Sequence, residues 1–255
     1  MKGSRYDKIG IKQVIRLEWM DKILDLVVAD LPTKEIRSEL IEYLSNKKQS
    51  GGEGKRGKEA YMKALSILLQ TWCTPPKEIL DLRDAALEVA KKVPRKKRLF
   101  LHWAMISAAY PFWASVAKQT GRLLNLQNQT TQKQIVTRLK EQYGDRETIS
   151  RYARYVVRSL IAWGVLKDSK AKGFYEKGKH LIITDNNSAL MLLESSLLTI
   201  PENKSSLRVL LNSPSLFPFS LPNLSGDLIS QKSSRIEIIH HGFDDEILNL
   251  KKRGY

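Results

Sequence analysis

One stretch of the sequence, residues 145–163, constrains the fold more than any other. Its apolar residues recur at the three- and four-residue spacing of a helix with one buried face. They are Ile149, Ala153, Val156, Val157, Leu160 and Ile161. Arg151, Arg154 and Arg158 fall on the opposite face, because positions i, i+3 and i+7 share one side of a helix. The pattern predicts a helix over residues 146–163 with an apolar back and a cationic front.

Two further helices are predicted immediately upstream, over residues 112–124 and 132–143. A polar connector, residues 125–131, is expected between them. Gly144 ends the second helix, because glycine readily adopts the backbone conformation that closes a helix. Asp145 is a candidate N-cap for the helix that follows.

Downstream, the sequence predicts a hairpin. After Gly164 come a short strand at residues 165–167, a polar stretch with lysines at residues 168–178, and a second strand at residues 179–184. Three helices closed by a two-stranded hairpin are the element order of a winged helix-turn-helix. The expected fold class is mainly α, with a multi-helix N-terminal region and a winged helix-turn-helix that carries a small β-hairpin wing.

Three regions follow from this organisation. Within residues 1–110 the sequence predicts helices and a basic, glycine-rich loop at residues 46–58 that has no apolar side chain. Residues 111–200 are the predicted winged-helix region. Residues 201–255 form a C-terminal tail that contains proline and phenylalanine.

The tail is expected to contain a strand at residues 235–240, where the pattern alternates, and a short helix at residues 244–250. Between residues 210 and 224 it has three prolines and an apolar segment, residues 216–219. Such a segment packs either on the body of the protein or on a partner, and the sequence leaves both open.

The charge of the chain is concentrated around the predicted winged helix. Lys and Arg number 43 against 27 Asp and Glu, a formal net charge of +16. Residues 131–180 hold 12 basic and 5 acidic side chains, whereas residues 181–255 hold 7 and 8. A surface this positive attracts polyanions such as DNA, RNA or an acidic membrane face. We expect a nucleic-acid partner, with duplex DNA as the leading candidate and RNA left open.

Position along the predicted helix separates two kinds of contact. In helix-turn-helix proteins the N-terminal part of the recognition helix meets base edges. The base-reading candidates are Arg146, Thr148, Ser150 and Arg151. Arg154 and Arg158, further along, are expected to contact phosphates. The alternative is a solvated helix face whose arginines pair with Asp145 and Glu147 at little gain in stability.

The predicted hairpin carries a second group of candidates. Lysines on a flexible hairpin suit point-charge contacts with phosphates or the minor groove. They are Lys167, Lys170, Lys172, Lys177 and Lys179. The alternative is a soluble turn without a ligand. Two other basic segments, the loop at residues 46–58 and the run at residues 95–98, are candidates to extend the phosphate footprint.

Catalytic and compartment signals are few. The four histidines are not at metal-ligand spacings, and the glycine-rich residues 51–55 lack the spacing of a phosphate-binding P-loop. Cys73 is the one cysteine, which excludes an internal disulfide and a cysteine-rich zinc site. No apolar run reaches the roughly 18 residues of a membrane helix, and no signal peptide is recognised. We expect a cytoplasmic, non-enzymatic protein with no cofactor, metal or membrane partner.

Two strings of residues point to a relative. The string Tyr110-Pro111-Phe112 and the run Arg158-Ser159-Leu160-Ile161-Ala162-Trp163-Gly164-Val165-Leu166 resemble BrxA, the small helical accessory protein of BREX phage-defence systems. The resemblance spans about residues 15–200, and the proline- and phenylalanine-bearing tail has no counterpart in it. It implies a DNA-binding accessory component of a multi-protein defence complex, with no catalytic residues.

Two alternatives to this function stay open. One is a sequence-specific transcription regulator of the same fold, which requires two-fold symmetry or a tight half-site. The other is a protein–protein adaptor whose basic faces dock on acidic partners and whose apolar residues 216–224 act as the anchor. A nuclease is less well supported, because Glu237 has no acidic partner at a convincing spacing.

Overall fold

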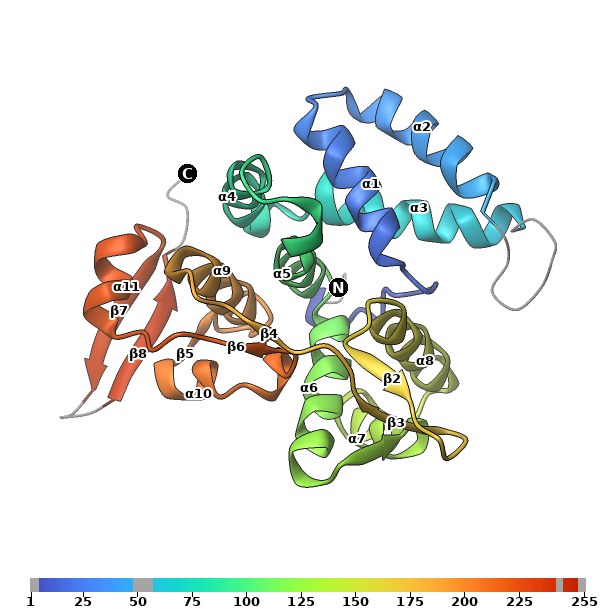
Figure 1. Cartoon of the computed structure of the whole chain (residues 1–255). Helices are drawn as coiled ribbons and strands as arrows, with labels where there is room; N and C mark the ends of the chain where they lie inside the picture. The colour runs from blue at the N-terminus through green and yellow to red at the C-terminus, as the bar shows by residue number, and fades with distance from the viewer. Residues whose placement is uncertain (1–4, 48–56, 242–244, 252–255) are drawn as a thin grey trace.

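The computed structural model describes residues 5–47, 57–241 and 245–251, and it is mainly helical with small sheets (Figure 1). The N-terminal part is formed by α-helices joined by short 3-10 turns. The helices are α1 (Leu17–Val28), α2 (Thr33–Ser45), α3 (Lys58–Trp72), α4 (Leu80–Ala90) and α5 (Leu99–Ala109), and the turns are η1 (Arg5–Asp7), η2 (Lys77–Ile79) and η3 (Arg95–Lys97). Most of the predicted basic loop at residues 46–58 lies outside the described residues.

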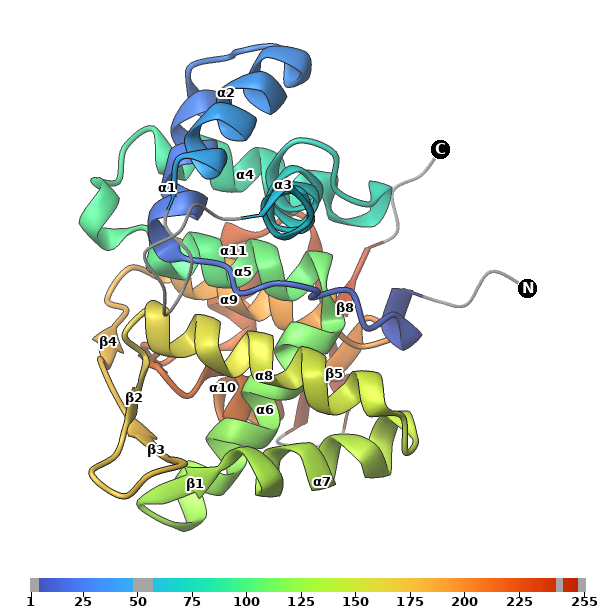
Figure 2. The same cartoon turned by 90° about the vertical axis from the view of Figure 1, so that its right-hand side faces the viewer.

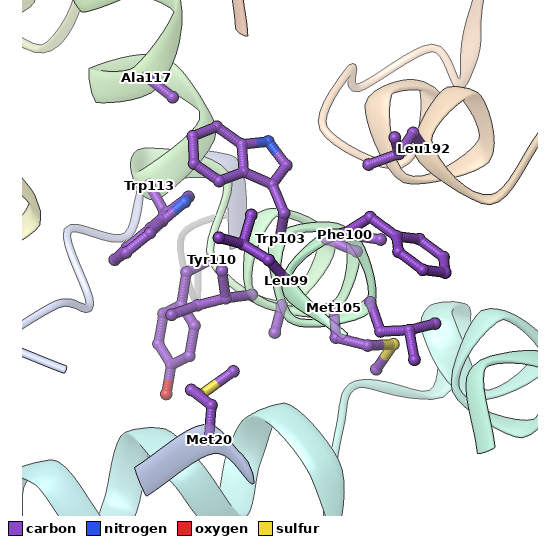
Figure 3. Close-up of a cluster of buried hydrophobic side chains, with 14 of the residues drawn as sticks. Met20, Leu99, Phe100, Trp103, Met105, Tyr110, Trp113, Ala117 and Leu192 are labelled. Atoms are coloured by element: carbon purple, nitrogen blue, oxygen red, sulfur yellow. The ribbon is translucent and has the colours of Figure 1, made fainter. Parts of the chain in front are cut away.

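Helix α5 is the centre of the molecule. Every one of its residues is buried, as expected for a helix that is apolar on all sides. Helices α1, α3, α4 and α6 (Pro111–Leu126) pack around it, and so does α9 (Asn186–Leu197). Figure 3 shows Trp103 of α5 near Trp113, with Leu192 of α9 and Met20 of α1 on opposite sides of the helix. The two indole rings meet edge to face at 6.3 Å between centroids.

Residues 111–177 form a unit of three helices and a small sheet below α5 (Figure 1). After α6 come β1 (Gln129–Thr131), α7 (Gln132–Tyr143), α8 (Glu147–Ala162), β2 (Leu166–Asp168) and β3 (Phe174–Lys177). The sheet is antiparallel in the order β1-β3-β2, and Tyr175 of β3 lies opposite both Thr130 and Asp168. The side chains of Thr130 and Tyr175 are buried, so this face of the sheet packs on the helices.

The structure corrects two sequence predictions in this unit. The connector at residues 125–131 ends in a strand, β1, which only its pairing with β3 reveals. The second hairpin strand, predicted at residues 179–184, lies instead at β3, where Gly173 with a positive φ of 84° closes the turn. Part of the predicted range does form a strand, β4 (Leu181–Ile182), but it pairs in parallel with β6 (Phe219–Ser220) of the tail.

The tail packs on the body of the protein. Helix α9 precedes the tail and was not predicted from the sequence; it is buried from Ser188 to Leu197 and lies against α5. The 3-10 turn η4 (Pro214–Leu216) packs on α6 at Gly121, where an added Cβ would lie 2.0 Å from the Pro214 carbonyl oxygen. The ring centroids of Phe217 and Phe219 lie 5.8 and 5.5 Å from the ring centroid of Trp103. The apolar segment proposed as an anchor for a partner is therefore used within the chain.

The last elements of the tail form a second antiparallel sheet. It has the order β5-β8-β7, and helix α11 (Gly226–Lys232) packs on β7. The strands are β5 (Lys204–Ser206), β7 (Ile236–His241) and β8 (Asp245–Leu250), and the short helix α10 (Leu207–Leu211) follows β5. The strand predicted at residues 235–240 is confirmed. The helix predicted at residues 244–250 is wrong, because its described part is β8, where Leu248 is fully buried between two half-buried neighbours.

Candidate nucleic-acid interface

Helix α8 has the two faces that its periodicity predicts. Its buried side chains pack against α6 and α7. They are Ile149, Ala153, Val156, Val157, Ser159 and Leu160. Arg151, Arg154 and Arg158 are all exposed. Ile161, predicted to be in the core, is only half-buried. The arginine row is thus directed to solvent and is backed by a packed face, which limits its freedom to rotate away.

The start of α8 differs in detail from the prediction. Gly144 ends α7 with a φ of 83°, as expected, but the N-cap is Arg146 and it makes no side-chain capping bond. Asp145 therefore is not the cap. Its carboxylate pairs with Lys140 Nζ at 2.6 Å, while the Arg146 guanidinium donates to the Tyr143 carbonyl oxygen at 2.9 Å. Asp145 turns toward α7 because it stands one residue before the cap.

The three arginines of α8 have different surroundings. Arg158 donates to both carboxylate oxygens of Asp168 at 3.1 and 3.2 Å and lies 5.9 Å from the Tyr175 ring. Arg151 lies over the ring of Tyr152 at 5.3 Å. Arg154 has no hydrogen bond or ion pair within the described part of the chain. Two of the three guanidinium groups are therefore free of any carboxylate among the described residues, and neither Asp145 nor Glu147 pairs with the row.

The base-reading candidates lie together on the first half of α8. The side chains of Arg146 and Arg151 are exposed, whereas those of Thr148 and Ser150 are half-buried. The backbone oxygen of Ser150 is approached by the Gln132 amide of α7 at 3.5 Å, so this part of α8 is held close to α7. The two arginines can reach further from the surface than the two hydroxyl side chains.

The five hairpin lysines are all exposed, and they divide into two groups. Lys167 pairs with Glu176 at 3.2 Å, and Lys177 donates to Asn125 at the end of α6 at 3.0 Å. Lys170 and Lys172 stand in the turn between β2 and β3, and Lys179 follows β3; none of these three has a polar partner across the described ranges. Lys170 and Lys172 are therefore the hairpin cations best placed to meet a ligand.

The hairpin and α8 face the same side of the molecule. Figure 2 shows α8 across the front of the view, with β2 and β3 beside its C-terminal end and α7 below it. The sheet is held to α8 by contacts with β2 and by the Arg158–Asp168 pair. The arginine row and the turn lysines thus form one basic surface, which the sequence could only predict from element order.

Asp168 and β1 are the parts of this surface that the sequence analysis missed. The carboxylate lies ten residues after Arg158, across the turn at Gly164, so no helical or strand periodicity connects the two. Strand β1 has only three residues and lies in a polar stretch of the sequence. Local patterns carry no signal for either, because both depend on how β2 and β3 return to α8.

Other kinds of site have less support. No cluster of three or more His, Cys, Asp or Glu side chains placed to hold a metal ion occurs within residues 5–47, 57–241 and 245–251. Burial raises the pKa of the Cys73 thiol to about 11, so this thiol is protonated at neutral pH and is a poor nucleophile. Among the helices of the described chain, none combines the length and apolar character needed to cross a membrane.

Comparison with models of known protein families, with curated proteins and with solved structures found no match. The resemblance to BrxA therefore stays a prediction from the two sequence strings.

Proposed function

We propose that the protein binds duplex DNA through a winged helix formed by α6, β1, α7, α8, β2 and β3. Three helices followed by an antiparallel hairpin are the elements of this motif. The observation that carries the proposal is the exposed row of Arg151, Arg154 and Arg158, backed by a buried face and placed beside the lysine-bearing turn. In such a motif α8 is the recognition helix and the β2–β3 hairpin is the wing.

The dimensions of α8 suit this role. With 16 residues it is about 24 Å long, and a helix with its side chains is about 10–12 Å across. The major groove of B-DNA is about 12 Å wide and accepts one helix. A guanidinium group can bond a guanine edge or a phosphate through two parallel hydrogen bonds, whereas the turn lysines supply point charges for phosphates.

Most of these cations are suited to phosphates, so we propose binding that tolerates many sequences. Among the base-reading candidates, only Arg146 and Arg151 are exposed. The resemblance to BrxA supports placing this activity in an accessory component of a phage-defence complex. Copurification of other defence proteins with the full chain would test that placement, and a selection from random duplexes would test the alternative of a sequence-specific regulator.

The central experiment reverses the charge of the two arginines that have no carboxylate partner, Arg151→Glu with Arg154→Glu. Arg158 is left unchanged, because its pair with Asp168 also holds the hairpin. With roughly five phosphate contacts, the wild type should show a slope of about −4 to −5 in log affinity against log salt. The double variant should lose on the order of 100-fold in duplex affinity at low salt, about 2.7 kcal/mol.

The matched control reverses two lysines on the other side of the molecule, Lys92→Glu with Lys232→Glu. Lys92 follows α4 and Lys232 ends α11, and both are exposed. Figure 1 shows α4 and α11 far from α8. The two double variants have the same net charge, so a non-specific loss of attraction would weaken both equally. Wild-type affinity in a folded Arg151/Arg154 variant, checked by circular dichroism, would overturn the proposal.

A further inference from the structure

A pocket of about 730 Å³ lies outside the candidate interface, and no residue of α8 or of the hairpin lines it. It is lined by the N-terminal segment, by α3, and by Tyr110 and Pro111 at the junction of α5 and α6. Its lining has four basic and two acidic side chains. They are Arg5, Lys8, Lys12, Lys63, Glu59 and Glu78. The pocket is therefore positive on balance and is open to an anionic ligand.

The N-terminal segment that forms one wall is fixed directly to α8. The backbone N–H of Ile15 donates to Ser159 Oγ at 2.8 Å, and Trp163 Nε1 donates to the Ile15 carbonyl oxygen at 3.0 Å. On its other side, Gln13 donates to the Ala60 carbonyl oxygen of α3 at 3.4 Å. Figure 2 shows this segment crossing the molecule between α8 and the end of α3. The contacts with Ser159 and Trp163 are buried, so they fix the segment that lines the pocket against α8.

Lys63 of α3 lines the pocket and is paired with Glu59 of the same helix. Its hydrogen bond to Glu59 raises the pKa of its ammonium group, and Tyr155 and Tyr152 of α8 raise it further. These two tyrosine rings stack with centroids 6.2 Å apart on the flank of α8. Because Lys63 already has a carboxylate partner, it is less available to an anion than the unpartnered cations of the pocket.

The remaining cations of the pocket are available to a ligand to different degrees. Lys8 and Lys12 are exposed, and their ammonium groups have no polar partner in the part of the chain that the structure describes. Arg5 is half-buried and donates to the carbonyl oxygens of Ala108 and Leu198, which orients its charge without neutralising it. Lys8 and Lys12 are therefore the side chains that an anion would contact first.

We propose that this pocket binds the sugar–phosphate backbone of the same duplex, beyond the part that contacts α8. The proposal rests on DNA binding by α8. A duplex in contact with α8 continues past it, and a neighbouring positive surface gains counterion release for each phosphate it neutralises. Contacts of this kind fix the register of the protein on the duplex without reading its sequence. The N-terminal region would then be part of the DNA-binding site.

The test replaces the two unpartnered lysines without reversing charge, Lys8→Gln with Lys12→Gln, in the full-length protein. The control is Lys92→Gln with Lys232→Gln. Affinity is measured over a range of salt concentrations on a duplex of about 10 base pairs, roughly one turn, and on one of about 20. On the long duplex the slope of the Lys8/Lys12 variant should be about 2 smaller in magnitude, because each lost phosphate contact removes about 0.9. On the short duplex it should match the wild type.

The outcomes separate this inference from the proposed function. An unchanged slope on the long duplex, with binding still lost in the Arg151/Arg154 variant, overturns the pocket and leaves the role of α8 intact. Wild-type binding by the Arg151/Arg154 variant overturns both. If inorganic phosphate raises the melting temperature of the wild type but not of the Lys8/Lys12 variant, and duplex binding is the same in both, the pocket holds a small anion instead and the proposal is wrong.

Discussion

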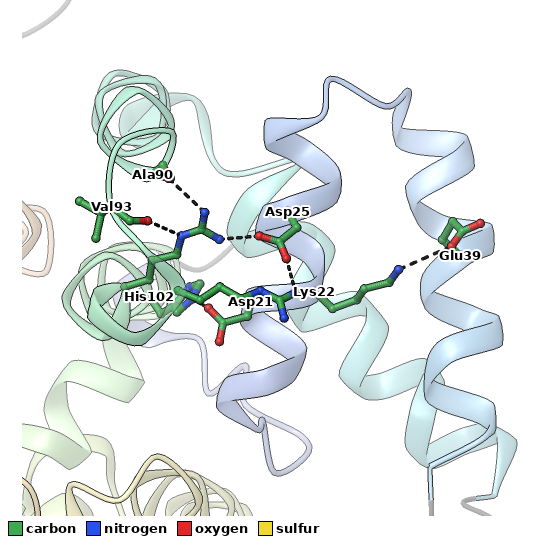
Figure 4. Close-up of polar contacts among 9 residues, drawn as sticks. Asp21, Lys22, Asp25, Glu39, Ala90, Val93 and His102 are labelled. Carbon is green, nitrogen blue, oxygen red and sulfur yellow. Dashed lines mark hydrogen bonds and ion pairs between the residues drawn. The ribbon is translucent and has the colours of Figure 1, made fainter.

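Two groups of arginines in this protein look alike in sequence and differ in the structure. The run at residues 95–98 is as basic as α8 and was a candidate for the phosphate footprint. In the fold, Arg95 and Arg98 both donate to Asp25 of α1 (Figure 4). Arg98 also binds the carbonyl oxygens of Ala90 and Val93, and its side chain is only 11% exposed. These two charges stabilise the packing of α1 on α5, whereas Arg151 and Arg154 have no such partner.

The difference shows that a count of basic residues overstates the charge available to a ligand. A guanidinium group that is paired and buried contributes to stability, and its removal leaves an unpaired carboxylate. An exposed guanidinium group without a partner contributes little to stability and is free to bind an anion. Mutation of the first group should therefore change the free energy of unfolding, whereas mutation of the second should change the affinity for DNA.

The largest effect is expected for Asp25→Ala, which leaves Arg98 without its anion. Although burial opposes ionisation of Asp25, hydrogen bonds from Arg95 and Arg98 lower the pKa of this carboxyl group. We expect a loss of about 2 kcal/mol in the free energy of unfolding, less than for a fully buried pair because Asp25 is partly exposed. Urea denaturation measures it. The duplex affinity of the folded variant should equal that of the wild type. A loss of duplex affinity in the folded variant would contradict the assignment of Arg95 and Arg98 to stability alone.

The stability of the protein should also depend on pH, through His102. His102 of α5 is fully buried, its Nε2 lies 2.9 Å from Asp21, and burial lowers the pKa of its imidazole. The neutral ring therefore contributes stability that is complete above the unfolded pKa of about 6.5 and is lost as pH falls toward the folded pKa.

Between pH 6.5 and 5.5 the free energy of unfolding should fall by up to about 1 kcal/mol because of this group. Thermal unfolding across that range measures the effect, and His102→Gln should flatten the profile. The arginines of α8 keep their charge throughout, so duplex affinity of the folded protein should not follow the same curve. A flat stability profile in the wild type would count against a neutral buried His102.

The smallest effect is expected for Asp168→Asn. Its carboxylate is the one partner of the α8 arginines among the described residues, and it would also face the phosphates of a bound duplex. Removing this charge should tighten duplex binding by about threefold, or about 0.65 kcal/mol, which is the magnitude of one exposed charge interaction.

A double-mutant cycle provides the control for that gain. In an Arg158→Gln background, Asp168→Asn should change affinity by less, because the guanidinium group that it releases is absent. An equal gain in both backgrounds would assign the effect to bulk charge and would leave Arg158 as a purely structural side chain.

Prediction from sequence succeeded where a pattern is local. The helix at α8 and its exposed arginines follow from a spacing of three and four residues, and α7 begins and ends where the sequence placed it. Prediction failed for β3, β8 and α9. Strands of a few residues are defined by their partners, and α9 is apolar on one part of its surface and rich in serine on the rest, yet it is buried all round.

The sequence by itself determined that this chain forms amphipathic helices, carries a large positive charge and has one helix with arginines along its outer face. Helical periodicity and composition depend on near neighbours, so no fold is needed to recognise them. Only the tertiary structure decided which of the basic side chains meet a carboxylate, that the tail covers α5 and α6, and that Ile15 is hydrogen-bonded to Ser159 of α8. Such contacts join residues as distant as Asp25 and Arg98, 73 positions apart, and they exist only once the chain has packed.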